Sequence, residues 1–129
     1  MKFTQQRPDG ANLIRSYGAD FIVVGERELR ASCIIGVDTL MPWSPRSVEE
    51  LDAPALEKLF ALSPEVVVLS TGATQKFPRA ALRAQFATRK IGLEVMEIGA
   101  ACRTYNVLVG EERRVLAAVL LPASRKQSE

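Results

Sequence analysis

The sequence predicts an α/β fold: one three-layer domain with a mixed central β-sheet, an N-terminal antiparallel hairpin, and helices on both faces of the sheet. First, residues 66–69 form a continuous apolar run, which is typical of a strand buried on both faces. Second, helical and strand patterns alternate from residue 52 onward, which favours parallel strands joined by right-handed crossovers. Third, apolar and polar residues alternate after residue 29, as in an antiparallel strand with one solvent-exposed face.

The early part of the chain predicts the hairpin. Residues 1–17 are polar and irregular, with a turn signal at Pro8-Asp9-Gly10. Strands are expected at 18–24 and 29–35, and one face of the second strand carries Leu29, Ala31, Cys33 and Ile35. Residues 37–45 contain two prolines, which exclude a central strand, so we expect an extension at the sheet edge followed by a loop.

Helices and strands are expected to alternate over the rest of the chain. Asp52 before Ala53-Pro54 predicts a helix start, while Ser47 and Glu50 have capping-box spacing. Pro78 opens the second helix and Gly92 precedes the next strand. The expected order is helix 52–62, strand 65–70, helix 78–90, strand 93–98, helix 101–109 and strand 115–121.

Length and composition agree with one domain. The chain has 129 residues, of which 47% are hydrophobic and 25% charged, and these are ordinary globular values. We assign residues 1–122 to the domain and 123–129 to a polar C-terminal tail. The longest apolar run, residues 115–121, is far shorter than the roughly 20 residues of a membrane helix. Residues 1–6 lack the apolar core of a signal peptide, so we expect a cytoplasmic protein without a transmembrane segment.

Several chemistries are excluded by residues that the chain lacks. It contains no histidine, which removes histidine-based triads, imidazole metal sites and imidazole pH switches. The two cysteines, Cys33 and Cys102, cannot by themselves complete a tetrahedral zinc site. In a reducing compartment we expect both thiols to stay free. The sequence therefore predicts no metal and no cofactor.

One edge of the predicted sheet collects candidate binding groups. Ser70, Thr71, Gly72 and Thr74 follow one buried strand, and residues 99–102 follow the next. Ligands of open α/β sheets bind beyond the carboxyl ends of parallel strands, where free N–H groups at helix starts favour an anion. We call residues 70–75 and 99–106 the predicted rim. The alternative is that Gly72 only makes the turn and that the hydroxyls only cap it.

The third helix supplies four further candidates. At the predicted helix start, the dipole and the adjacent Arg103 would lower the pKa of Cys102, although cysteine is more often a buried packing residue. A hydrolytic cysteine also needs a base, and no histidine exists. Tyr105 and Asn106 are polar within an apolar helix, which indicates either ligand recognition or hydrogen bonds to a neighbouring loop.

The second helix is strongly basic. Five cations and no acid occur between residues 66 and 93, namely Lys76, Arg79, Arg83, Arg89 and Lys90. Such a stripe can bind nucleic acid or anionic lipid, but most are solvated helix faces. The formal net charge of the chain is only +2, and no pattern of aromatic interleaving or recognition motif supports nucleic-acid binding. We therefore expect no nucleic-acid partner.

Several of these segments occur together in one known family. Trp43 follows the hairpin, Thr71-Gly72 ends the buried strand, and Pro78 opens the next helix. The most specific stretch is residues 101–108, Ala-Cys-Arg-Thr-Tyr-Asn-Val-Leu, followed by Arg113-Arg114-Val115. Over nearly its whole length the chain resembles the domain-of-unknown-function 498/598 family. The candidate ligand-binding residues are Ser70, Thr71, Gly72, Thr74, Cys102, Arg103, Tyr105, Asn106 and Trp43.

The resemblance implies a three-layer domain with a mixed central sheet and no established enzyme activity. The family includes a mitochondrial assembly factor of respiratory complex I, which implies a protein partner such as respiratory-complex subunits or membrane-insertion machinery. We therefore interpret the chain as a non-enzymatic interaction domain that assists assembly of a membrane-bound respiratory complex. The alternative is a small-ligand (anion or nucleotide) binding protein, or a cysteine-dependent enzyme, that uses the predicted rim. The oligomeric state stays open.

Overall fold

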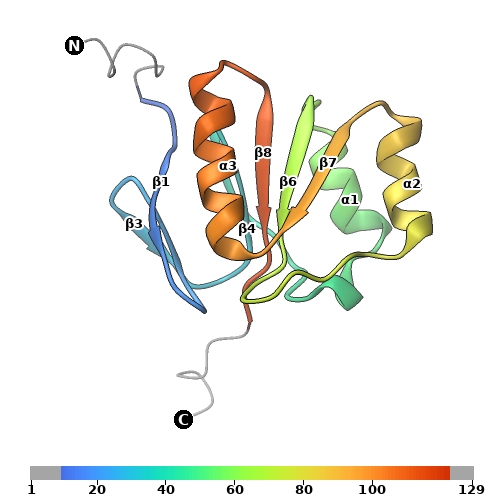
Figure 1. The fold of residues 1–129 in the computed structure, drawn as a ribbon, viewed down its shortest axis with the longest axis horizontal. Helices are drawn as coiled ribbons and strands as arrows, with labels where there is room; N and C mark the ends of the chain where they lie inside the picture. Colours follow the sequence, from blue (N-terminus) through green and yellow to red (C-terminus); the bar gives the residue numbers. More distant parts are fainter. Residues whose placement is uncertain (1–9, 123–129) are drawn as a thin grey trace.

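The structure is a computed structural model that describes residues 10–122. Its larger sheet has five strands in the order β5-β4-β8-β6-β7 (Figure 1). These strands are β4 (Cys33–Gly36), β5 (Thr39–Pro42), β6 (Val66–Ser70), β7 (Gly92–Met96) and β8 (Val115–Val119). Strands β7, β6 and β8 are parallel, whereas β4 is antiparallel to both of its neighbours, β8 and β5. The expected mixed central sheet is confirmed.

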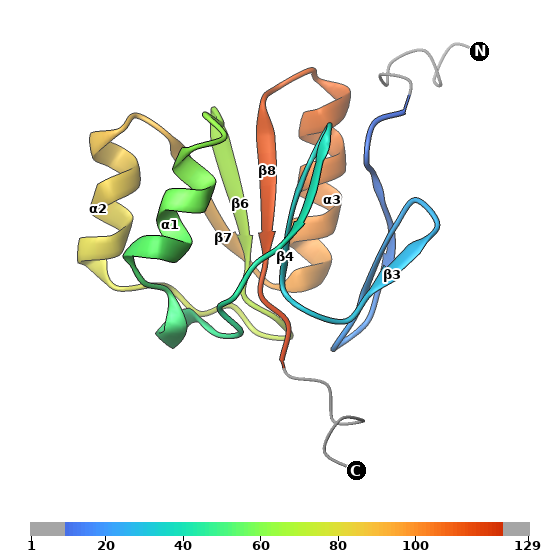
Figure 2. The same ribbon diagram turned by 180° about the vertical axis from the view of Figure 1, so that it is seen from behind.

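Helices cover both faces of this sheet, as expected (Figures 1 and 2). The helices are α1 (Ala53–Phe60), α2 (Ala80–Thr88) and α3 (Ile98–Gly110), with a 3₁₀ turn, η2 (Val48–Glu50), before α1. Helices α1 and α2 lie on one face and α3 lies on the other. A smaller antiparallel sheet, of β1 (Ile14–Tyr17), β2 (Ile22–Val24) and β3 (Arg27–Leu29), lies beyond β4 on the α3 side.

The core has two parts, one on each face of the larger sheet. Val66 and Val68 of β6 point into the cluster that α3 and the small sheet cover. Val67 and Leu69 point into the cluster under α1 and α2. All of β6 is buried, and it pairs in register with β7 and β8 on its two sides. The prediction of a strand buried on both faces, with a parallel neighbour at residues 93–98, is confirmed for β6 and β7.

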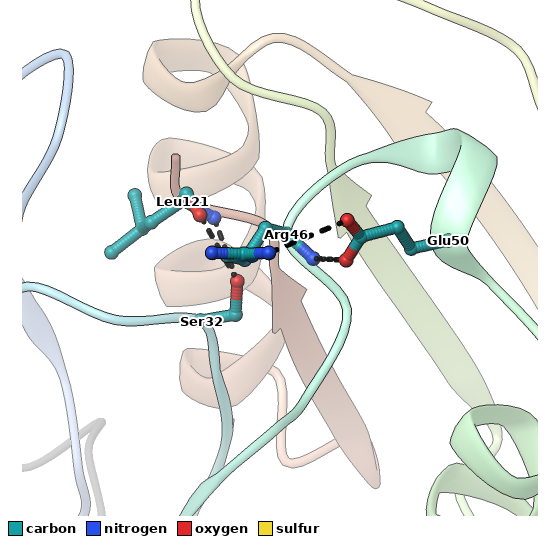
Figure 3. A network of polar contacts seen from close by, with 4 residues as sticks. All are labelled: Ser32, Arg46, Glu50 and Leu121. Carbon is teal, nitrogen blue, oxygen red and sulfur yellow. Dashed lines mark hydrogen bonds and ion pairs between the residues drawn. The ribbon is translucent and has the colours of Figure 1, made fainter. Parts of the chain in front are cut away.

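The start of α1 is as the sequence predicts. The Asp52 carboxylate accepts a hydrogen bond of 3.0 Å from the Ala55 backbone N–H, and Pro54 stands in the first turn. Ser47, the competing start, makes no capping bond with its side chain and precedes only the short turn η2. Instead, Glu50 of η2 accepts a hydrogen bond from the backbone N–H of Arg46, with 2.9 Å between Glu50 Oε1 and the amide nitrogen (Figure 3).

The predicted return strand at 29–35 is wrong, because the chain changes sheets in the middle of it. Strand β3 ends at Leu29, and β4 begins at Cys33 in the larger sheet. Between them the buried Ser32 hydroxyl donates to the Leu121 carbonyl (3.3 Å) and accepts from the Leu121 N–H (2.9 Å), as Figure 3 shows. Strand β4 then lies between β5 and β8 and is buried throughout, so the wet face expected for this strand is absent.

Three boundaries also differ from expectation. Residues 14–17 form β1, although we expected residues 1–17 to be irregular; Gly10 lies in a turn, and the rest of the expected turn lies outside the described residues. Helix α2 begins at Ala80 rather than at Pro78. Helix α3 begins at Ile98, a position expected to lie in a strand. The polar tail expected at residues 123–129 also falls outside the described residues.

We predict that Val68→Asp abolishes folding. Val68 is fully buried between the sheet and α3, so the substitution places an unpaired carboxylate in the core. An unpaired buried carboxylate costs more than the roughly 2–7 kcal/mol of an unpaired neutral polar group, which is of the order of the stability of a whole domain, about 5–15 kcal/mol. Circular dichroism melting tests this, with Val107→Asp as the matched control because Val107 is 58% exposed. A soluble, cooperatively melting Val68→Asp protein would contradict the buried position of β6.

Candidate functional site

The two segments of the predicted rim meet at one edge of the larger sheet. Ser70 of β6 pairs with Met96 of β7, so the two parallel strands end side by side. The β6–α2 connection and the first turn of α3 both lie at this edge, the lower one in Figure 1. The predicted location of these segments is therefore correct, and the remaining question is whether their polar groups are available to a ligand.

The loop after β6 uses its own polar groups. Thr71 Oγ1 donates to the Thr74 carbonyl (2.7 Å) and accepts from the Lys76 N–H (3.1 Å). Gly72 has a φ of +100°, a conformation that favours glycine, and its carbonyl accepts from the Ile98 N–H at 2.8 Å. Thr74 is exposed. The contacts of Thr71 and Gly72 are those of the alternative reading, in which the hydroxyl and the glycine make the turn.

The N-terminus of α3 is capped by the chain itself. The Glu97 carboxylate accepts hydrogen bonds from the N–H groups of Gly99 (2.7 Å) and Ala100 (2.8 Å). These two bonds lower the pKa of Glu97, and the charge of Arg103 acts in the same direction. The carboxylate occupies the place where helix N–H groups would bind an anion. An external anion at this helix would therefore have to displace Glu97.

The expected low pKa of Cys102 is wrong. Because α3 begins at Ile98, Cys102 lies in the second turn and not at the positive end of the helix. The side chain is buried, and burial raises the pKa of Cys102 to about 12; the nearby Glu97 carboxylate adds to this rise and Arg103 only opposes it. Burial also raises the pKa of Cys33 to about 12. Both cysteines are free and belong to the same core cluster.

Tyr105 and Asn106 bind the N-terminal segment of the chain. The fully buried Tyr105 donates its hydroxyl hydrogen to the Asn12 carbonyl at 2.7 Å. The Asn106 side chain accepts from the Ile14 N–H (3.0 Å) and donates to the Ile14 carbonyl (2.9 Å). These are hydrogen bonds to a neighbouring segment, one of the two readings that the sequence left open. A ligand-binding role for either residue stays a prediction.

Trp43 lies apart from the other candidates. Its side chain is buried, and its indole N–H donates to the Ala55 carbonyl at 3.0 Å. It packs in the cluster under α1 and α2, whereas Cys102 and Tyr105 belong to the cluster on the opposite face. Arg103 is exposed on α3. The structure thus brings residues 70–74 near the start of α3 and leaves Trp43 on the other side of the sheet.

Ser70 has an unusual environment. Its side chain is fully buried, and its hydroxyl has no hydrogen-bond partner among residues 10–122. By strand alternation Ser70 lies on the same face as Val66 and Val68, which points it towards α3. A buried hydroxyl without a partner destabilises the fold by about 1–3 kcal/mol. Within the described residues, no group of three or more acidic or cysteine side chains is placed to hold a metal ion.

Sequence reasoning missed the residues that organise this region. Glu97 is the cap of α3, but glutamate is not among the preferred N-cap residues, so the sequence carried little signal for it. Asn12 was assigned to an irregular segment, yet its side-chain amide donates to the carbonyls of Gly36 and Thr39, both at 3.0 Å. An asparagine near a turn was the only available hint of this contact.

We predict that Ser70→Ala leaves the protein equally stable or stabilises it by up to about 1 kcal/mol. The substitution removes a buried hydroxyl that has no partner, and the lost volume is that of one atom. Chemical denaturation of the two proteins measures the difference in the free energy of unfolding. A loss of stability greater than about 1 kcal/mol would mean that the hydroxyl is hydrogen-bonded in solution.

We also predict that iodoacetamide modifies neither cysteine in the native protein near neutral pH. Only the thiolate reacts, and with a pKa of about 12 roughly one Cys102 thiol in ten thousand is ionised at about pH 8. In unfolded protein the thiol has its ordinary pKa of about 8.5, so roughly 3% of it is ionised at about pH 7 and it reacts readily. Mass spectrometry of labelled native and unfolded protein measures the rate at which iodoacetamide modifies each cysteine in the two states. Rapid native labelling of Cys102 at about pH 7 would overturn this picture of a protonated core thiol.

Comparison with known proteins gives the family. A family model described as protein of unknown function (DUF498/DUF598) matches residues 14–120. The chain is 28% identical over 120 residues to the zebrafish (Danio rerio) protein named NADH dehydrogenase (ubiquinone) 1 alpha subcomplex assembly factor 3, a match that covers 92% of this chain and 68% of that protein. Across the curated relatives with this name, the chain spans 48–68% of their length.

Solved structures agree with the fold. An NMR structure of a Xanthomonas campestris protein is 38% identical, with a TM-score of 0.81 over 94% of this chain and 92% of that chain. A Bordetella pertussis protein described as an Mth938-like domain shares the fold, with a TM-score of 0.80 at 22% identity over 95% of this chain and 94% of that chain. Since the family model spans almost the whole described domain, the chain belongs to the DUF498/DUF598 family of proteins of unknown function.

Proposed function

We propose that this protein is a non-enzymatic interaction domain that assists assembly of a membrane-bound respiratory complex by binding a protein partner. One observation carries the proposal: curated relatives named as complex I assembly factors align with up to 92% of this chain. The similarity therefore extends over the whole domain rather than over a single motif. The partners that we propose are respiratory-complex subunits or membrane-insertion machinery, and the location is the cytoplasm.

The chemistry of the predicted rim supports a non-enzymatic role. Thr71 is hydrogen-bonded within its own loop, and Glu97 occupies the start of α3. Burial keeps the Cys102 thiol protonated, whereas a cysteine nucleophile acts as the thiolate. The sequence also contains no histidine to act as its base. These contacts favour a structural role for Thr71 and Cys102 over the alternative of a ligand-binding or cysteine-dependent rim.

The surface offers one prominent anchor for a protein partner. Phe77, in the loop before α2, is 63% exposed and is the most exposed large hydrophobic side chain among the described residues. The cationic residues Lys76 and Arg79 stand on its two sides in the sequence and are exposed. Aromatic residues beside arginine are typical anchors of protein interfaces. We propose that Phe77 contacts the partner and that these cations favour an acidic surface.

In this proposal the protein partner brings the domain to the membrane-bound complex. None of the helices within residues 10–122 is both long enough and apolar enough to cross a bilayer. The domain would therefore reach a membrane-bound complex through its protein partner. This is why the proposed test measures the assembled complex and not only the behaviour of the isolated domain.

Deletion of the gene, followed by complementation, tests the proposal in the organism that carries it. We expect the deletion to reduce the assembled respiratory NADH dehydrogenase, measured by native gel electrophoresis, and the wild-type gene to restore it. Phe77→Ser should restore it less well, whereas the matched control Val107→Ser, at a residue 58% exposed on α3, should restore it fully. Normal levels of the assembled complex in the deletion strain would contradict the proposed function. Full restoration by Phe77→Ser would contradict only the proposed contact.

A further inference from the structure

Two adjoining hollows lie at the edge of the larger sheet opposite the predicted rim. This is the upper edge in Figures 1 and 2, where the chain enters β6, β7 and β8. One hollow has a volume of about 390 Å³ and mainly apolar walls, and the other has a volume of about 620 Å³ and mainly polar walls. They share three lining residues, Pro64, Arg113 and Arg114, so they lie next to each other.

The polar hollow is strongly cationic. Four basic side chains line it, together with a single carboxylate, that of Glu65; the basic residues are Arg89, Lys90, Arg113 and Arg114. They come from the two turns that precede β7 and β8. The chain therefore concentrates positive charge from two separate connections at one place, although its formal net charge is only +2. Concave surfaces lined by one sign of charge attract ligands of the opposite sign.

The carboxylates near this hollow leave part of the positive charge unbalanced. Glu65 pairs with Arg113 (3.5 Å) and accepts from the Arg114 backbone N–H (2.9 Å). Arg89 pairs with Glu57 (3.7 Å) and lies 4.1 Å above the ring centroid of Phe60. Lys90 has no ion-pair partner within residues 10–122. Glu65 is the one carboxylate that lines the polar hollow, and Asp38 and Glu112 line the adjoining apolar hollow, which shares Arg113 and Arg114. Part of the positive charge of the polar hollow, that of Lys90 included, is therefore without an ion pair among the described residues.

The pKa of Glu65 is lowered by its contacts with the turn before β8. The hydrogen bond from the Arg114 backbone N–H is the largest influence and lowers this pKa, and the charges of Arg113 and Arg114 lower it further. The carboxylate is therefore ionised at neutral pH and stabilised where it stands. A second anion beside it would be attracted by the cations that Glu65 does not neutralise.

The apolar hollow next to it has the size of a ligand pocket. Pockets for small molecules have volumes of about 300–1,000 Å³ and mainly apolar walls. Val109, Val115 and Leu116 line this hollow with buried side chains, and Leu62, 38% exposed, lines it from the turn after α1. Asp38 and Glu112 line this hollow and not the polar one, whereas Arg113 and Arg114 line both, so an anionic group is less favoured here than beside Lys90. The charges thus favour one orientation, with the apolar part here and the anionic part beside Lys90.

We propose that the two hollows form one binding site for an amphipathic phosphoryl compound. Its apolar body lies against Leu62, Val115 and Leu116, and its phosphoryl group lies between Lys90 and Arg113. Guanidinium and ammonium groups bind phosphoryl oxygens through charge-assisted hydrogen bonds. The apolar body belongs either to a nucleotide or to an alkyl phosphate such as a lipid-derived phosphate. This site is separate from the predicted rim and from the proposed protein contact at Phe77.

Calorimetric titration of the purified full chain tests the proposal with four probes: inorganic phosphate, hexyl phosphate, adenosine monophosphate and hexanol. We expect at least one of the two phosphoryl compounds with an apolar body to bind at least about tenfold more tightly than inorganic phosphate, and more tightly than hexanol. Tighter binding of hexyl phosphate identifies an alkyl source, and tighter binding of the nucleotide identifies a nucleotide source. Equal affinity for all phosphate compounds, or no saturable binding up to about 10 mM, would overturn the proposal.

Variants separate this site from general charge attraction. Lys90→Gln with Arg113→Gln should weaken binding about tenfold or more, because two charge-assisted contacts are lost. Lys76→Gln with Arg79→Gln removes the same charge from the β6–α2 connection at the opposite edge and should leave binding unchanged. Equal weakening in both double variants would overturn the proposal. Leu62→Asp should weaken binding of the preferred probe but not of inorganic phosphate, and unchanged binding of that probe would contradict the role of the apolar hollow.

Discussion

The hydrogen bonds between α3 and β1 are the contact on which the position of the small N-terminal sheet depends. Helix α3 packs against the larger sheet and, at the same time, against the N-terminal strand. Asn106 gives the backbone of Ile14 both a donor and an acceptor, as a neighbouring strand would. Of the four residues of β1, only Ile14 is buried. Burial alone therefore holds this strand weakly, and the Asn106 amide supplies polar contacts that fix its position.

The same contacts explain why two residues of α3 look functional in the sequence. A tyrosine and an asparagine inside an apolar helix need polar partners, and a ligand is one source of them. Here the partners are the carbonyl of Asn12 and the backbone of Ile14. The first turns of the helix are also occupied by structural contacts, because Glu97 caps the backbone N–H groups and Cys102 is buried. Tyr105, Asn106 and Cys102, in the most specific stretch of the sequence, thus serve the packing of α3 between two sheets.

Prediction from the sequence succeeded where the signal was local. The apolar run of β6 predicts burial on both faces, and Asp52 with Pro54 predicts the start of α1. It failed where the deciding contact is distant in the chain. Strand β1 depends on a residue 92 positions away, and the change of sheets at Ser32 depends on Leu121, 89 positions away.

The candidate site follows the same division between local and distant signals. Its edge of the sheet could be predicted because parallel strands end together, as Ser70 and Met96 do. The chemistry of Cys102 could not be predicted, because it depends on burial under the sheet and on a helix that begins three residues before the expected position. The cationic hollow could not be predicted either, because Lys90 and Arg113 are far apart in the sequence and line the same hollow only in the folded chain.

Amide hydrogen exchange of Asn106→Ala, measured by NMR, tests the structural role of α3 most directly. The account predicts that exchange at the Ile14 amide becomes about 10–100-fold faster, because the loss of one such hydrogen bond corresponds to about 1–3 kcal/mol of local stability. Amides of β6, such as that of Val67, should keep their protection, because this strand is buried between β7 and β8. Unchanged protection at Ile14 would contradict the account, and so would an equal loss of protection at Ile14 and Val67.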